Sequence, residues 1–238
     1  MKERNKMSVG FRVFLQRKLP EENVVEGLCE LPAANIADVM GRSCAMSSEI
    51  RKLTPRSEKN MAGPALTVRA RPGDNLMIHK ALNLAQKGDI IVISNESDRS
   101  QSLLGAIIVA YARSKELGGI VVDGPIRDID EISELGIPVY ATGTTPGGPY
   151  KEGPGEVNVP IACGGVSVHP GDVILGDSDG VIVIPRKDAV QVLEEATAFS
   201  RVDAEKMEAA LAGRAKRDWV DKKLNEKNCE IIDGCCEN

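Results

Sequence analysis

The amino-acid sequence predicts an α/β fold built on a mixed sheet or on two packed sheets. Residues 90–93 and 120–122 are apolar, β-branched runs without a polar interruption, which is typical of strands buried on both faces. A helical pattern lies between them. Beyond residue 138, short strands follow one another without intervening helices, and this order favours a mixed sheet over a doubly wound one. No GxGxxG or GxxxxGK[ST] fingerprint of a nucleotide site supports the alternative.

Local patterns place each element of the first half. Proline near a helix start, glycine past a helix end and period-two alternation in strands are the signals used. The expected order is two helices over 21–45 (the second beginning near Pro32 and ending at Gly41), a strand at 63–70, a turn at 71–75, an amphipathic helix to Gln86, a strand at 88–94 and a helix over 103–117. The last helix is expected to pack Leu104, Ile107, Ile108 and Tyr111 on one face.

The second half is expected to carry short strands and then long helices. After the strand at 120–122 come a short helix at 130–135, a strand at 138–141, a turn-rich loop at 143–155, strands at 157–162, 166–169, 173–175 and 181–184, a long helix at 188–211 and a last helix at 218–225. Because no change of composition marks a boundary, we expect a single domain over 1–238. Its core covers about 30–190, followed by a helical C-terminal arm (about 188–225) and a polar tail (226–238).

Composition narrows the classes of function. A net charge of −5 and an aromatic content of 3% argue against a phosphate-binding surface or base-stacking platforms, so no nucleic-acid partner is expected. No apolar run reaches the length of a membrane span, and no apolar stretch follows the charged N-terminus. Six cysteines without CxxC spacing fit free thiols in a reducing cytoplasm. A soft-metal site at Cys229, Cys235 and Cys236 is the less favoured alternative.

The most informative motif is Ile120-Val-Val-Asp-Gly-Pro-Ile-Arg-Asp128. Gly124 and Pro125 end the buried strand, and Arg127 and Asp128 follow at once. Ligands of α/β proteins collect beyond the carboxyl ends of such strands. An arginine there can bind an anionic substrate and an aspartate a divalent cation. A structural salt bridge is the alternative explanation from these residues alone.

Several separate motifs together resemble the family that contains the regulator of ribonuclease activity A and the class II 4-hydroxy-4-methyl-2-oxoglutarate aldolases. The resemblance covers about residues 30–190. Its motifs are Gly63-Pro-Ala-Leu-Thr-Val, Pro72-Gly-Asp-Asn-Leu with His79-Lys-Ala-Leu, Gly88-Asp-Ile-Ile-Val, Gly119-Ile-Val-Val-Asp-Gly-Pro-Ile-Arg-Asp, Val157-Asn-Val-Pro with Gly164-Gly-Val, Pro170-Gly-Asp-Val and Asp177-Ser-Asp-Gly-Val-Ile-Val-Ile-Pro.

The resemblance implies a β/β/α fold like the swivelling phosphohistidine domains, with helical arms, in a homotrimer or homohexamer. It also implies a Mg²⁺- or Mn²⁺-dependent lyase that cleaves or decarboxylates a small 2-oxoacid through a pyruvate enolate, as an aldolase or an oxaloacetate decarboxylase. Asp128 matches the family's metal ligand and Arg127 the arginine that contacts substrate oxygens. Glu205 is the best match to a catalytic carboxylate from a neighbouring subunit, with Asp203 and Glu208 as alternatives.

One departure from the family concerns the helix before the motif. Ala106 occupies a position that is acidic in the aldolases, so aldol cleavage is in doubt. Gly105 and the amides of Ile107 and Ile108 are expected to bind a substrate carboxylate at the helix start. Two other functions stay open. One is that of a non-catalytic, protein-binding regulator of the ribonuclease-inhibitor type, and the other is that of a lyase for a different 2-oxoacid.

Overall fold

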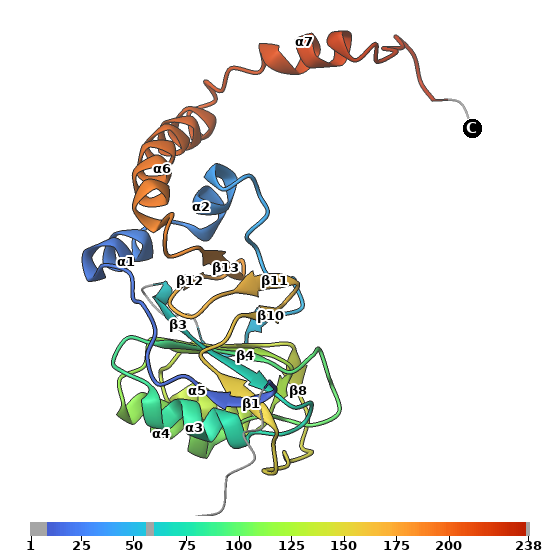
Figure 1. Cartoon of the computed structure of the whole chain (residues 1–238). Coiled ribbons are helices and arrows are strands. Elements are labelled where there is room, and N and C mark those ends of the chain that lie inside the picture. The colour runs from blue at the N-terminus through green and yellow to red at the C-terminus, as the bar shows by residue number, and fades with distance from the viewer. Residues whose placement is uncertain (1–8, 56–59, 237–238) are drawn as a thin grey trace, which may run out of the picture. The chain divides into compact units, whose positions relative to one another are not determined.

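A nine-stranded mixed sheet forms the centre of the protein (Figure 1). The structure, a computed structural model, describes residues 9–55 and 60–236. The chain divides into two compact units, residues 1–198 and 199–238. The first unit contains all the sheets of the described residues. The second contains the last part of a long helix and one further helix.

The elements of the structure alternate between strands and helices up to residue 134 and then become mainly strands. In order they are β1 (Phe11–Val13), α1 (Glu22–Cys29), α2 (Ala33–Val39), β2 (Arg51–Lys52), β3 (Met61–Ala70), α3 (Leu76–Leu84), β4 (Ile90–Ser94), α4 (Ala106–Ser114), β5 (Gly119–Asp123), β6 (Pro125–Ile126), α5 (Ile129–Glu134), β7 (Val139–Ala141), β8 (Gly143–Thr144), β9 (Gly155–Val157), β10 (Ile161–Cys163), β11 (Val166–Val168), β12 (Val173–Gly176), β13 (Val181–Ile184), α6 (Ala189–Leu211) and α7 (Asp218–Glu226).

Seven strands of the central sheet have the order β1-β9-β3-β4-β5-β7-β2. Strands β12 and β13 complete the nine, because β12 pairs with β3 and with β13. Strands β3, β4, β5 and β7 run parallel, whereas β9 and β2 are antiparallel to their neighbours β3 and β7. The long strand β3 pairs with β4 through its second half and with β12 through its first half. This strand therefore joins the parallel strands to the β12–β13 hairpin. The mixed sheet expected from the sequence is confirmed.

Three apolar clusters hold the layers of the first unit together. Helices α3, α4 and α5 cover one face of the sheet, as Figure 1 shows, and bury side chains such as Ile78, Val109 and Ile132 against it. The opposite face packs against β10–β13. Helices α1, α2 and the start of α6 cover the outer side of β12 and β13. Strands β4 and β5 are buried along their whole length, as their β-branched runs predicted.

Most expected elements are present, and two expectations were wrong. The strand expected over 157–162 is broken into β9 and β10, because Asn158 adopts a left-handed conformation (φ 58°) and Pro160 has no amide hydrogen. The side chains expected to form the buried face of α4 do not share it. Ile107 is 86% exposed and Tyr111 47% exposed, whereas Ile108, Val109 and Ala112 are buried. Helical spacing predicted that α4 has an apolar face, but it did not identify which apolar residues pack against the sheet.

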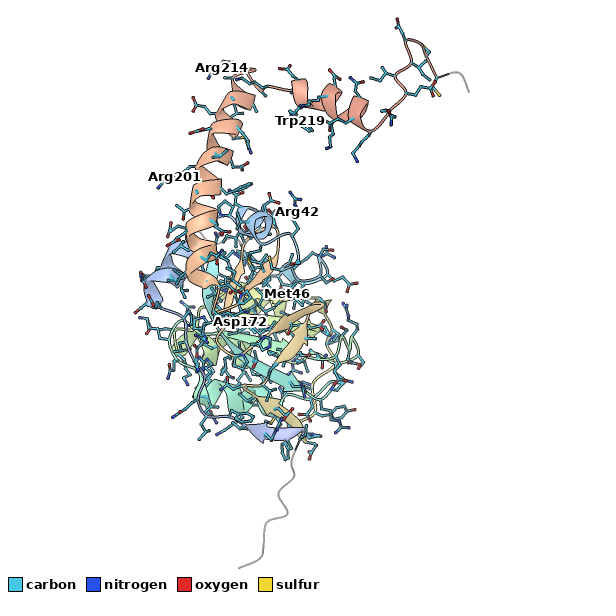
Figure 2. The ribbon with its side chains drawn as sticks, turned by 45° about the horizontal axis from the view of Figure 1, so that its top comes forward. Arg42, Met46, Asp172, Arg201, Arg214 and Trp219 are labelled. Carbon is cyan, nitrogen blue, oxygen red and sulfur yellow. The ribbon has the colours of Figure 1, made fainter. Side chains whose placement is uncertain are left out.

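The second unit carries apolar side chains that its own helices do not bury. Val202, Met207 and Leu211 on α6 are exposed, and so are Trp219 on α7 and the residues Ile231 and Ile232 of the tail. Figure 2 shows Arg201 on α6 and Trp219 on α7. Among the described residues, no helix has the length and apolar character that crossing a bilayer requires.

Candidate functional site

A pocket lies at the edge of the sheet where the parallel strands end. Its volume is about 200 Å³. Four segments that follow β3, β4, β5 and β8 contribute to it. The lining residues are Asn75, His79, Leu104, Gly105, Ile107, Ile108, Arg127, Asp128, Gly148, Pro149 and Lys151. The carboxyl edge of parallel strands is the usual ligand position in α/β proteins. Arg127 and Asp128 thus lie where the sequence placed them.

Backbone pairing fixes the Arg127–Asp128 segment next to the start of α4. The Leu103 amide donates to the Pro125 carbonyl and the Arg127 amide donates to the Leu104 carbonyl, each at 3.0 Å. On the other side, β6 pairs in parallel with β8. The segment is therefore held between α4 and the glycine-rich loop of residues 143–155. Its side chains are positioned by ladder-like hydrogen bonds and not by a free turn.

Asp128 has the backbone of a left-handed residue, with φ 58° and ψ 44°. Aspartate tolerates this conformation better than most residues, and such geometry at a cleft carries a modest energetic cost. The turn directs its carboxylate back toward α4, where Oδ2 accepts a hydrogen bond from the Ala106 amide at 3.1 Å. The same oxygen lies 3.6 Å from Arg127 Nε. Both side chains remain about two-fifths exposed, at 39% for Asp128 and 42% for Arg127.

Two glycines make room for these charged groups. A Cβ on Gly105 would lie 2.2 Å from Asp128 Oδ2 and 3.1 Å from Arg127 Nε. A Cβ on Gly148 would lie 2.9 Å from Arg127 Nη1. The backbone of Gly105 (φ −141°) is one that any residue can adopt. Glycine is thus required at position 105 by the space that the carboxylate occupies, and this requirement was not evident from the sequence.

The first turn of α4 supplies amide groups at the pocket. The Ala106 amide binds Asp128, and the Ile108 amide donates to the Gly105 carbonyl at 3.1 Å. Within the described ranges, the Ile107 amide has no protein acceptor. Of the two amides expected to bind a carboxylate, that of Ile107 is the one left available. The exposed Ile107 side chain forms an apolar wall beside it.

Another part of the pocket wall combines polar groups from α3 and from the loop 143–155. Asn75 is buried and donates to the Leu103 carbonyl at 3.0 Å, while its Oδ1 has no partner among the described residues. His79 and Lys151 also line the pocket. Burial and, secondarily, the Lys151 ammonium lower the pKa of His79 below 6.5. The imidazole is therefore neutral at pH 7, and the wall presents one cation, Lys151.

The donor set of the pocket fits a hard divalent cation. The described part of the chain holds no group of three or more His, Cys, Asp or Glu side chains able to bind a metal. Mg²⁺, however, keeps several waters and needs only one or two carboxylates besides its substrate. Asp128 offers a half-exposed carboxylate, and Asn75 Oδ1 is an unpartnered oxygen in the same pocket. Asp128 is thus the residue that would hold such an ion.

The third group of expected site residues lies in the second unit. Glu205, Asp203 and Glu208 are on α6, and Glu205 and Glu208 are exposed. They are not among the residues that line the pocket within one chain. A role for Glu205 in catalysis therefore stays a prediction that involves a second subunit. The sequence predicted no place in the pocket for Leu104, Gly148 or Pro149, since no local pattern shows which positions will face a cavity.

The fold and the site define a class: a mixed α/β protein with a pocket at its sheet edge that is lined by Arg127, Lys151 and the Asp128 carboxylate. Comparison with known proteins then identifies the family. The sequence model of the RraA-like family, described as Aldolase/RraA, matches residues 33–183. The chain therefore belongs to the RraA-like family, and the resemblance seen in the sequence is confirmed.

Individual relatives include both named activities of this family. A Halalkalibacterium halodurans protein named "Putative 4-hydroxy-4-methyl-2-oxoglutarate aldolase" is 37% identical over 197 residues, covering 82% of this chain and 92% of its own. Streptomyces coelicolor RraAS2, titled an unusual member of the RNase ES inhibitor RraA family, is 28% identical (TM-score 0.71; 81% of this chain, 98% of that one). Thermus RraA, titled an RNA-processing inhibitor, is 31% identical (TM-score 0.60; 66% and 93%).

Proposed function

We propose that this protein is a divalent-metal-dependent carbon–carbon lyase that decarboxylates or cleaves a small 2-oxoacid through a pyruvate enolate. The observation that carries the proposal is the pairing of Arg127 and Asp128 in one pocket beside the free Ile107 amide. The likeness to the protein named as an aldolase supports the same chemistry. A volume of about 200 Å³ suits a metabolite of a few carbon atoms rather than a larger ligand.

Each charged or polar group of the pocket has a separate role in the proposed reaction. A bound Mg²⁺ or Mn²⁺, held by Asp128, would supply Lewis acidity toward the carboxylate and keto oxygens of the substrate. Arg127 stabilises the negative charge that develops on the enolate oxygen, an effect often worth several kcal/mol of barrier. The Ile107 amide at the start of α4 binds the substrate carboxylate. Lys151 in the pocket wall attracts a second anionic group.

The two reactions differ in what else they require. Decarboxylation of oxaloacetate needs only stabilisation of the enolate, whereas aldol cleavage also needs a base that removes the substrate hydroxyl proton. Ala106 has no such group. We therefore propose decarboxylation as the stronger activity, and Glu205 of a neighbouring subunit as the base for cleavage. A base from a neighbouring subunit requires an oligomer, and we propose a homotrimer or homohexamer. We also propose that the core of each subunit is like that of swivelling phosphohistidine domains.

A regulator that binds a ribonuclease assembly is the second candidate. Its support is the structural similarity to RraAS2 and to Thermus RraA, whose titles name them as inhibitors. The intact Arg127–Asp128 pair favours the lyase, because binding of a protein partner does not require a cation site in a small pocket. A lyase for a different 2-oxoacid is the third candidate, with the small Ala106 leaving room for another substituent.

The decisive experiment is a screen of 2-oxoacids with Mg²⁺ and Mn²⁺ that measures pyruvate release. Asp128→Asn keeps a residue that tolerates the left-handed backbone but removes the charge, and we expect it to lower turnover at least about a hundredfold. Asp130→Ala is the matched control, since Asp130 is an exposed acid two positions away that does not line the pocket. Metal affinity is measured by calorimetry. If Asp128→Asn has the same turnover and the same metal affinity as wild type, the proposal is contradicted.

A further inference from the structure

The loop that carries Lys151 is bound to the segment before α3 by an unusually complete set of hydrogen bonds. The Tyr150 amide donates to the Gly73 carbonyl at 2.8 Å, and the Asn75 amide donates to the Tyr150 carbonyl at 2.9 Å. Asp74 and Tyr150 form an isolated parallel bridge. The two segments thus pair like short strands beside the pocket that Asn75 and Lys151 line.

The carboxylate of Asp74 is the centre of this connection. Its Oδ2 accepts hydrogen bonds from the amides of Glu152 (2.6 Å) and Gly153 (2.9 Å). Its Oδ1 accepts one from the Leu76 amide, at 2.9 Å, in the first turn of α3. Asp74 is only 2% exposed, so these bonds are shielded from water. A charged acceptor with three amide donors is among the stronger arrangements that a loop can have.

Lys151 lies between the two tied positions. Its neighbours Tyr150 and Glu152 are both fixed to residues 73–75, so its backbone has little freedom. Among the described residues, no carboxylate pairs with its ammonium group, which acts electrostatically on His79. A lysine whose backbone is already fixed loses less entropy on binding an anion than a lysine on a mobile loop does.

We infer that Asp74 is a positioning residue that holds the Lys151 backbone in the wall of the pocket, where the ammonium binds an anionic group of the substrate. The inference rests on the proposed function for its substrate class. It extends that function by assigning a task to a buried acid that touches neither substrate nor cation. Asp74 acts only through the backbone of residues 152 and 153.

Trypsin tests the placement of Lys151 without any assumption about activity. In wild type the Glu152 amide is bound, so the Lys151–Glu152 bond resists cleavage. Asp74→Asn replaces one acceptor oxygen by an amide donor that faces other donors, and we expect cleavage at this bond to accelerate by about tenfold or more, as followed by mass spectrometry. Asp172→Asn is the matched control. Asp172, labelled in Figure 2, is likewise a buried aspartate whose carboxylate accepts hydrogen bonds from backbone amides, those of His169 and Arg186.

The kinetic arm uses a double-mutant cycle on oxaloacetate decarboxylation. Asp74→Asn and Lys151→Met should each raise KM about tenfold with a smaller change in kcat, and the double variant should resemble Lys151→Met alone. A purely structural Asp74 would instead give additive losses and a fall in kcat. If Asp74→Asn does not fold, hydrogen exchange in wild type replaces it. Protected Glu152 and Gly153 amides support the inference, and freely exchanging ones overturn it.

The failure of each hypothesis has a separate signature. Absence of turnover by wild type on every 2-oxoacid would refute the proposed function, and trypsin would still decide whether Asp74 holds Lys151. Equal cleavage after Lys151 in wild type, Asp74→Asn and Asp172→Asn would refute the positioning role even in a fully active enzyme. Additive effects on KM in the double variant would also refute it.

Discussion

Gly105→Ala separates the requirements of the pocket from those of folding. The added Cβ would lie 2.2 Å from Asp128 Oδ2, well inside van der Waals contact, so the carboxylate has to move. Movement breaks the 3.1 Å hydrogen bond from the Ala106 amide and shifts the position at which a cation would bind. The backbone at residue 105 (φ −141°) accepts alanine without strain. The perturbation is thus confined to the space between α4 and Asp128.

The magnitudes predict a small loss of stability and a large loss of activity. A hydrogen bond to a charged group contributes about 1.5–3 kcal/mol, and the 39% exposure of Asp128 favours the lower end because water can replace the bond. Replacing glycine by alanine in a compatible backbone returns about 0.4–1 kcal/mol through the unfolded state. The net loss is about 1 kcal/mol, or roughly 2–4 °C in Tm for a chain of this size. Activity should fall about a hundredfold or more.

Chemical denaturation measures the stability of Gly105→Ala, calorimetric titration measures its affinity for Mg²⁺, and oxaloacetate decarboxylation measures its activity. Gly147→Ala serves as the control, because its Cβ would meet the end of the flexible Gln101 side chain at 3.2 Å and the Ser100 carbonyl oxygen at 3.4 Å, and neither belongs to the Arg127–Asp128 pair. We expect it to retain activity. Wild-type metal affinity and turnover in Gly105→Ala would show that the position of the Asp128 carboxylate does not matter. An unfolded Gly105→Ala would show that the segment is needed for the fold itself.

Three further predictions concern the base, the histidine and the assembly. Ala106→Glu should raise aldol cleavage of 4-hydroxy-4-methyl-2-oxoglutarate by about 10²–10⁴-fold over wild type, and decarboxylation much less, as coupled pyruvate assays would show; no change would leave Glu205 as the first residue to test. Lys151→Met should raise the pKa of His79 toward 6.5 in an NMR titration, with His169, the only other histidine, as internal control. Since the folded pKa of His79 is lowered, its contribution to stability falls as pH decreases through 6.5, and His79→Gln should flatten that slope. Light scattering at micromolar concentration should give a trimer or hexamer, because apolar side chains of the second unit are exposed in the single chain; a monomer mass would contradict the shared site.

The sequence was most informative where structure is local. The buried strand β5, its glycine-proline end and the adjacent Arg127–Asp128 pair depend on residues within one short stretch, and all three are found as expected. Short strands such as β1 and β2 were not expected, because two or three residues carry no periodicity and their pairing depends on distant partners.

The remainder of the site required three-dimensional information. Nothing local shows that Ile107 faces the pocket rather than the sheet, since α4 has apolar residues on more than one face. The contact of Gly105 with Asp128 joins positions more than twenty residues apart. The bonds from Asp74 to residues 152 and 153 span an even longer separation, and the sequence predicted only a turn at 71–75.

All residues that line the pocket lie between Asn75 and Lys151, in the interior of the segment that the family shares. Changes at the ends of the chain therefore leave the lining of this pocket intact, whereas loss of α6 would also remove Glu205, the proposed base for cleavage. Conversely, a single substitution in the pocket, such as alanine in place of an acid at position 106, can weaken aldol cleavage without altering the surfaces that the ends of the chain offer for contact with other proteins.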